Sequence, residues 1–80
     1  MNKNDVFEKL KANLIACVPE LEGKEISIED SLAMLGANSV DRADIIMMTL
    51  EDVDVSIPLV SFNSVKNIEG IIDVILKSAN

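Results

Sequence analysis

The hydroxyl group of Ser39 is the side chain in this sequence that is best placed to take part in chemistry. It follows Gly36-Ala37-Asn38, a run of small and turn-prone residues, at a point where a helix is expected to begin. The unpaired amides and the positive dipole end of a helix N-terminus favour a phosphate group, so the position suits a serine phosphodiester. Position alone gives more weight to a second interpretation, in which Ser39 only caps the helix.

Catalysis by this serine is excluded by the rest of the sequence. The stretch is not G-x-S-x-G, and the chain contains no histidine to act as a general base. A single cysteine, Cys17, and the lack of histidine also rule out a disulfide and a Cys/His zinc site within one chain. Because Cys17 lies in the apolar pattern of the first helix, we expect a buried structural thiol. The sequence therefore predicts no catalytic residue, no metal ligand and no enzyme activity.

The charge distribution indicates the kind of partner. The 80 residues carry 14 acidic and 7 basic side chains, a net charge of −7, and the segment from Pro19 to Ser64 holds ten of the acids but only two of the bases. Such a field repels nucleic acid and anionic lipid and steers association toward basic protein surfaces. Acidity that merely keeps a small domain soluble is the alternative. No apolar run approaches the roughly 18 residues that span a bilayer. We therefore expect a cytoplasmic monomer without nucleic-acid or membrane partners.

The elements before Ser39 are expected to be one helix and one long loop within a single domain, 1–80. Apolar residues at intervals of three and four predict an amphipathic helix over residues 3–17 that ends before Pro19. These residues are Val6, Phe7, Leu10, Leu14, Cys17 and Val18. The loop over residues 19–38 is longer than compact domains usually tolerate, so apolar anchors must pin it to the core. The candidate anchors are Ile26, Ile28, Leu32, Met34 and Leu35.

The second helix is predicted to begin at Ser39. Asn38 is the expected N-cap, and Asp41 lies near the positive end of the helix dipole. The run Ile45-Ile46-Met47-Met48 wraps too far around a helix for all four side chains to face one core, so at least one should be exposed. A broad core stripe and a methionine-containing docking surface explain this run equally well.

Two further helices complete an all-α prediction. The segment from Pro58 to Asn63 indicates a brief third helix or turn, since proline is tolerated in a first helical turn. A last helix is predicted over about residues 65–77, with Ser64 as its possible cap. Its core face carries Val65, Ile68, Ile71, Ile72 and Ile75. No two alternating runs are joined by an Asn-Gly or Asp-Gly turn, so no sheet is expected.

An ordered set of short motifs resembles the acyl carrier protein family. In that family the attachment serine follows Leu-Gly-x-Asp, and here Leu35-Gly36-Ala37-Asn38 precedes Ser39. The likeness extends to Asp30-Ser31-Leu32, Ile57-Pro58 and Ser64-Val65, so it covers nearly the whole chain. The resemblance implies a four-helix bundle with a long loop between helices 1 and 2 and a short third helix. It also implies that a phosphopantetheinyl transferase uses coenzyme A to attach a 4′-phosphopantetheine arm to Ser39. The thiol of this arm would hold acyl groups as thioesters for enzymes that dock on the second helix.

Three residues near Ser39 depart from the usual family pattern. Asn38 replaces Asp, Val40 replaces Leu, and Arg42 adds a positive charge to a helix that is generally acidic. With Ile45-Ile46-Met47-Met48, they resemble the free-standing carriers of polyketide β-branching cassettes. This resemblance implies an acetyl donor for a 3-hydroxy-3-methylglutaryl synthase-like enzyme, with a ketosynthase, acyltransferase or decarboxylase of a polyketide pathway as further partners. The expected partner-recognition residues are Asn38, Val40, Asp41, Arg42 and Met47, with Arg42 on the solvated face of the helix.

Two other functions are compatible with the residues. The first is a carrier for fatty acid synthesis or for another polyketide or peptide pathway, which would bear the same arm and meet different enzymes. The second is an acidic helical interaction module in which Ser39 is only a cap. Modification of Ser39 by a transferase distinguishes the second from either kind of carrier.

Overall fold

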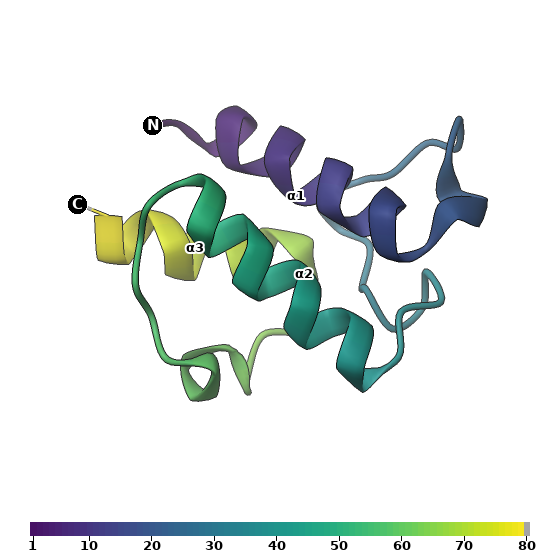
Figure 1. The fold of residues 1–80 in the computed structure, drawn as a ribbon. Helices are drawn as coiled ribbons and strands as arrows, with labels where there is room; N and C mark the ends of the chain where they lie inside the picture. The colour runs from purple at the N-terminus through teal and green to yellow at the C-terminus, as the bar shows by residue number, and fades with distance from the viewer. Residues whose placement is uncertain (80) are drawn as a thin grey trace.

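Three α-helices form the frame of the structure, a computed structural model that describes residues 1–79 (Figure 1). Helix α1 spans Lys3–Cys17, α2 spans Ser39–Asp52 and α3 spans Ile68–Ala79, and two short 3-10 helices, η1 and η2, cover Pro19–Leu21 and Leu59–Phe62. Residues 1–79 include no strand, which confirms the all-α prediction. The predicted count of four helices is not confirmed, because the expected third helix is only the 3-10 helix η2. None of the helices in this part of the chain is both long and apolar enough to span a membrane.

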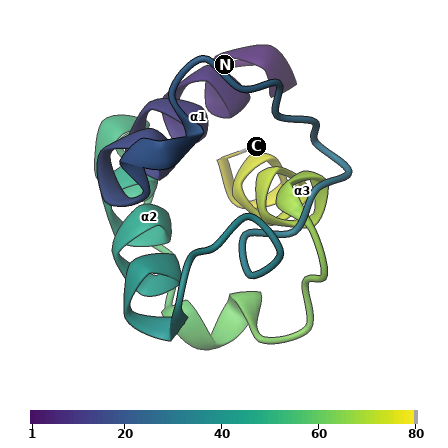
Figure 2. The same cartoon turned by 90° about the vertical axis from the view of Figure 1, so that its right-hand side faces the viewer.

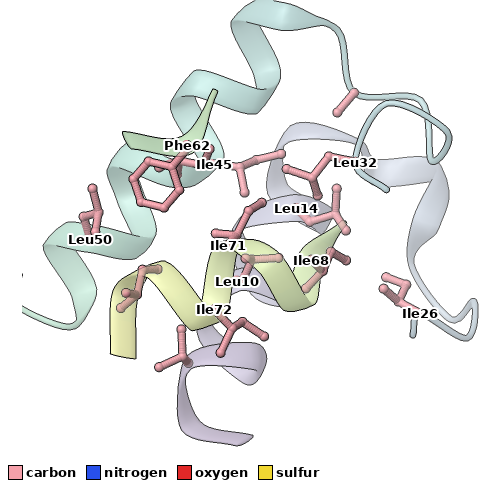
Figure 3. Close-up of a cluster of buried hydrophobic side chains, with 14 of the residues drawn as sticks. Leu10, Leu14, Ile26, Leu32, Ile45, Leu50, Phe62, Ile68, Ile71 and Ile72 are labelled. Carbon is pink, nitrogen blue, oxygen red and sulfur yellow. The ribbon is translucent and has the colours of Figure 1, made fainter. Parts of the chain in front are cut away.

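The helices enclose one core that is almost wholly aliphatic. Helix α1 contacts both α2 and α3, and η2 contacts α2 and α3 (Figure 2). The core side chains with no exposed surface are Val6, Leu10 and Leu14 of α1, Ile45 of α2, and Ile68, Ile72 and Ile75 of α3. Figure 3 labels Leu10, Leu14, Ile45, Ile68 and Ile72 among them. Phe62 of η2 adds a buried aromatic ring. Burial of these side chains from every helix supplies the hydrophobic free energy that holds α2, and with it Ser39, in place.

Helix α1 has the bounds that the sequence predicts. Asn2 caps it through a capping box, in which the Asn2 side chain accepts a hydrogen bond from the Asp5 amide at 2.9 Å and the Asp5 carboxylate accepts one from the Asn2 amide at 3.4 Å. The helix ends at Cys17, where the amide of Val18 donates to the carbonyl of Leu14 at 2.8 Å. Pro19 then begins η1, so the chain turns away from the helix axis at the predicted residue.

A buried polar contact fixes α1 against α2. The hydroxyl of Thr49 has no exposed surface and donates to the carbonyl of Ile45 at 2.7 Å, one turn earlier in α2. It also accepts a hydrogen bond at 3.0 Å from the side-chain amide of Asn13 in α1, and that amide donates to the carboxylate of Asp52 at 3.0 Å. Because the hydroxyl both donates and accepts, the polar group in the core is satisfied, and it sets the register of the two helices.

The long connection between α1 and α2 is pinned to α3 by backbone bonds as well as by apolar anchors. The amides of Ile68 and Glu69, at the start of α3, donate to the carbonyls of Asp30 and Ile28 at 2.9 and 2.8 Å. Of the expected anchors, Ile26 and Leu32 are buried, and Ile28 and Leu35 are partly buried against the core. Met34 was wrongly predicted to be an anchor, since 87% of its surface is exposed. The backbone amide of Met34 donates to the hydroxyl oxygen of Ser31, and the turn that contains this hydrogen bond directs the Met34 side chain into solvent.

The start of the last helix also differs from the prediction. Helix α3 begins at Ile68 rather than near residue 65, and its first turn is capped by Asn67, whose side-chain oxygen accepts from the Gly70 amide at 2.9 Å. Ser64 is therefore not the cap, and Val65 lies between the turn at Ser64 and the start of α3, although it still packs on the core. Apolar spacing could not locate this boundary, because the first amides of α3 are satisfied by loop carbonyls that are distant in sequence.

Candidate functional site

Ser39 is the first residue of α2, and its hydroxyl is free. The residue is exposed, and its hydroxyl forms no hydrogen bond to any group in residues 1–79. Capping is done by Asn38, as predicted: its side-chain oxygen accepts from the Asp41 amide at 2.8 Å, and the Asp41 carboxylate accepts from the Asn38 amide at 3.2 Å. This capping box satisfies the helix end without Ser39. The interpretation of Ser39 as a mere cap therefore loses its structural basis.

The turn before Ser39 is fixed by the backbone conformation of Gly36 and by two hydrogen bonds of Ala37. Gly36 has a φ of +102°, a backbone conformation that favours glycine, and Ala37 is buried with its amide donating to the carbonyl of Leu32 at 3.0 Å. The guanidinium of Arg42 reaches back along α2 and donates to the Ala37 carbonyl at 2.9 Å. Arg42 is half-buried, so its expected place on the solvated helix face is wrong. Its side chain helps to fix the turn that presents Ser39.

Cys17 lies close to the acidic start of α2. Burial, together with the negative charges of Asp41 and Asp44, raises the pKa of the Cys17 thiol above its usual value. The residue is half-buried at the end of α1. A raised pKa keeps the sulfur protonated near neutral pH, so the thiol is a poor nucleophile. The expected burial of Cys17 is only partial, because the last residue of α1 lies at the edge of the core.

Apolar side chains are exposed on α2 and on η2. Of the run Ile45-Ile46-Met47-Met48, the two isoleucines are buried, Met48 is half-buried and Met47 is 44% exposed, which confirms the expected exposed member. Val40, seven residues before Met47 and therefore on the same helix face, is 67% exposed. In η2, which contacts α2, Val60 is 68% exposed. Large apolar side chains in solvent around one helix are typical of a protein-binding surface.

A cleft of about 450 Å³ lies between α2, η2 and the start of α3. Its walls include Arg42, Ala43 and Ile46, which stand three, four and seven residues after Ser39 and so share a face of α2 with it. Buried apolar side chains contribute further lining, namely Leu32, Phe62 and Ile71 (Figure 3). The remaining polar lining comes from Ser31, Asn63, Lys66 and Asn67. The sequence prediction missed Lys66 and Asn67, which line the same cleft as Arg42 only because of tertiary packing.

The capping interaction beside Ser39 leads to a matched pair of substitutions. We expect Asn38→Ala to lower the free energy of unfolding by about 0.5–2 kcal/mol, because the Asp41 amide loses its acceptor. Asn38→Asp retains an acceptor oxygen and places a negative charge at the positive end of the helix dipole, so it should cause no such loss. Urea denaturation followed by circular dichroism measures both. If both variants lose the same free energy of unfolding, or if Asn38→Ala loses none, the side-chain acceptor at residue 38 does not stabilise the helix.

Comparison with known proteins gives three concordant matches. Residues 12–75 match the family model described as the phosphopantetheine attachment site. The chain is 45% identical over 75 residues to the polyketide biosynthesis acyl-carrier-protein AcpK of Bacillus subtilis (strain 168), covering 94% of this chain and 92% of the relative. A solved chain from the crystal structure of the curacin biosynthetic pathway HMG synthase in complex with acetyl donor-ACP superposes with a TM-score of 0.87 and 39% identity, and the match covers 100% of both chains.

Proposed function

The chain belongs to the acyl carrier protein family that is defined by a phosphopantetheine attachment site, and we propose that Ser39 is its attachment residue. The observation that carries this proposal is the exposed Ser39 hydroxyl, which is free because Asn38 caps the helix. Ser39 lies within the matched residues and directly follows the Leu35-Gly36-Ala37-Asn38 motif. The group fits this position, since Ser39 is exposed and a phosphodiester on the first residue of α2 meets the positive end of the helix dipole.

Attachment exchanges one phosphorus–oxygen bond for another. The Ser39 oxygen bonds to the phosphorus nearest the pantetheine of coenzyme A, the pyrophosphate bond breaks, adenosine bisphosphate leaves and the serine proton is lost. The chain has no histidine to accept that proton, so a separate phosphopantetheinyl transferase supplies the catalysis. When bound, the arm supplies a thiol that forms thioesters with acyl groups. Residues 1–80 act as one carrier domain in this proposal: they hold the arm, present it and catalyse no step.

We further propose that the protein serves polyketide β-branching by donating an acetyl group to an HMG synthase-like enzyme. Support comes from its likeness to a polyketide carrier and to an acetyl donor-ACP that was solved in complex with an HMG synthase. The exposed Val40 and Met47 on one face of α2 supply an apolar contact beside Ser39, and Asp41 supplies a negative charge for a basic enzyme surface. Asn38 and Arg42 contribute by shaping the turn that the enzyme meets. A ketosynthase, acyltransferase or decarboxylase of the same pathway would meet the same surface.

The donor assignment is tested by comparing acceptors. The acetylated carrier is mixed either with an HMG synthase of a β-branching pathway or with a fatty acid ketosynthase, and transfer of the acetyl group is followed by intact mass. Faster transfer to the HMG synthase is the expected result. Equal or slower transfer to it would favour the fatty acid or general carrier function instead.

Salt should weaken binding to such an enzyme. The segment from Pro19 to Ser64 holds ten acidic and two basic residues, so a basic partner is attracted by a field that added ions screen. We expect the dissociation constant to rise steadily between about 0.05 and 0.5 M sodium chloride, as the Debye length falls from more than 10 Å to about 4 Å. Titration of the synthase by calorimetry measures this slope. An affinity that does not change with salt would contradict electrostatic steering.

A further inference from the structure

We propose that Met34, in the loop before α2, is a contact for the enzyme that takes the acyl group, and that its side chain enters an apolar hollow of that enzyme beside the entrance for the arm. This inference rests on the proposed attachment at Ser39 and adds to it a recognition residue outside α2. The exposed fraction of Met34 is 87%, the largest among the exposed large apolar side chains of residues 1–79. A methionine side chain is flexible and polarisable, so it adapts to apolar surfaces of different shape.

A closed turn holds Met34 in this exposed place. The Met34 amide donates to the Ser31 hydroxyl oxygen at 3.0 Å, and the Leu35 amide donates to the Ser31 carbonyl at 3.1 Å. The ends of the turn are fixed as well, because the Ala37 amide donates to the carbonyl of Leu32 at 3.0 Å and both of these residues are buried. The backbone that carries Met34 is therefore ordered before a partner arrives, so binding has less conformational entropy to remove.

The turn lies at the same end of the molecule as Ser39. Figure 1 shows the last part of the α1–α2 loop and the start of α2 at one end, and the N-terminus at the other. Met34 is five residues before Ser39, so an extended chain would place the two about 17 Å apart, and the turn brings them closer. A protein interface of standard size covers about 800 Å² on each partner, a disc of about 16 Å radius. An enzyme that receives the arm from Ser39 therefore covers Met34 as well.

The segment that contains Met34 and Ser39 carries no charge. Residues 31–40 hold no charged side chain, although the chain has 14 acidic and 7 basic residues. Met34 and Val40 expose apolar side chains within this segment, and acidic residues adjoin it on both sides, at Asp30 and Asp41. The surface therefore complements a partner that has a neutral, apolar hollow flanked by basic side chains. A second copy of this chain is not such a partner, because its net charge of −7 would repel that of the first.

Binding measurements with two variants at position 34 test this contact. The arm-bearing parent, Met34→Gln and Met34→Leu are titrated by calorimetry into an HMG synthase of a β-branching pathway, after intact mass has confirmed that each bears the arm. Met34→Gln keeps the length of the side chain but makes its end polar, so it should raise the dissociation constant by about tenfold, as expected for a central apolar contact. Met34→Leu stays apolar and similar in volume, so it should retain most of the affinity. Ala12→Gln, which places the same polar side chain at an exposed position of α1, is the matched control and should bind as the parent does.

Two further measurements separate a lost contact from a change in charge or in the fold. The dependence of the dissociation constant on salt should be the same in Met34→Gln as in the parent, because no charge is altered. Thermal unfolding should also be the same, because the Met34 side chain lies in solvent. Equal affinity of Met34→Gln and the parent would overturn the inference, and so would an equal loss of affinity in Met34→Leu.

Failure of the proposed function gives different results. A parent that binds a fatty acid ketosynthase instead of the HMG synthase would remove only the donor assignment, and the same variants are then titrated into the ketosynthase with the same expected losses. A parent that gains no arm fails the mass check, and this would remove the attachment proposal and the inference together.

Discussion

Ser39→Ala is expected to abolish arm attachment completely while the fold stays intact. The free hydroxyl of Ser39 is the proposed acceptor of the phosphopantetheinyl group, and no other atom of α2 would replace it. Because Asn38 and Asp41 form the capping box and the Ser39 hydroxyl makes no hydrogen bond within residues 1–79, its loss should change the free energy of unfolding by less than about 0.5 kcal/mol. Intact mass after incubation with coenzyme A and a transferase measures attachment, and thermal unfolding measures the fold.

The matched control for this variant is Ser64→Ala. Ser64 is also exposed, but it lies in the turn before α3 and outside the proposed site, so this variant should gain the arm as the parent does. A Ser39→Ala protein that is destabilised by about 0.5–2 kcal/mol and a parent that gains no arm would together restore the capping interpretation. The structure opposes that outcome because it gives the cap to the neighbouring residue.

Ile45→Ala is expected to cost about 2–5 kcal/mol of folding free energy. Ile45 has no exposed surface, and its truncation loses apolar burial and leaves a cavity between α2 and the rest of the core. A domain of this length has a total stability of about 4–12 kcal/mol, so the variant should be partly unfolded at moderate urea concentrations where the parent is native. Urea denaturation followed by circular dichroism measures the loss.

Met47→Ala separates docking from folding on the same helix. Met47 lies two residues from Ile45 but is 44% exposed, so its truncation should change stability by less than about 0.5 kcal/mol. If Met47 is a central apolar contact, the same change should weaken binding to an HMG synthase by roughly tenfold. A Met47→Ala variant with unchanged synthase affinity would remove this residue from the proposed docking surface. A stable Ile45→Ala variant would show that α2 is not held by its buried face.

Local sequence signals were sufficient to predict the elements around Ser39. Helix α1 has the predicted bounds because its apolar spacing and Pro19 are both local features. The start of α2 and its Asn38 cap follow from Asn38 and Asp41, which lie three residues apart and bond to each other. Helix geometry also predicted that at least one side chain of Ile45-Ile46-Met47-Met48 would be exposed, because four consecutive side chains cannot all face one core, and the structure shows that Met47 is the exposed one.

Contacts between distant segments were beyond the reach of the sequence. Arg42 was expected in solvent, and only the folded turn shows its guanidinium at the Ala37 carbonyl. The start of α3 depends on carbonyls of the long loop, and Met34 is exposed because a turn at Ser31 directs it outward. Lys66 joins Arg42 in one cleft only after α2 and α3 have packed. Each of these features is set by backbone hydrogen bonding or packing across many residues, which apolar periodicity does not encode.

The most direct test of the carrier function is the mass of the unmodified parent protein after incubation with coenzyme A and a broad-specificity phosphopantetheinyl transferase. We expect a gain of one phosphopantetheinyl group per chain, and peptide mapping should place it on the fragment that contains Ser39. No gain, with a transferase that modifies another carrier in the same experiment, or a gain on a fragment that lacks Ser39, would contradict the proposed attachment site.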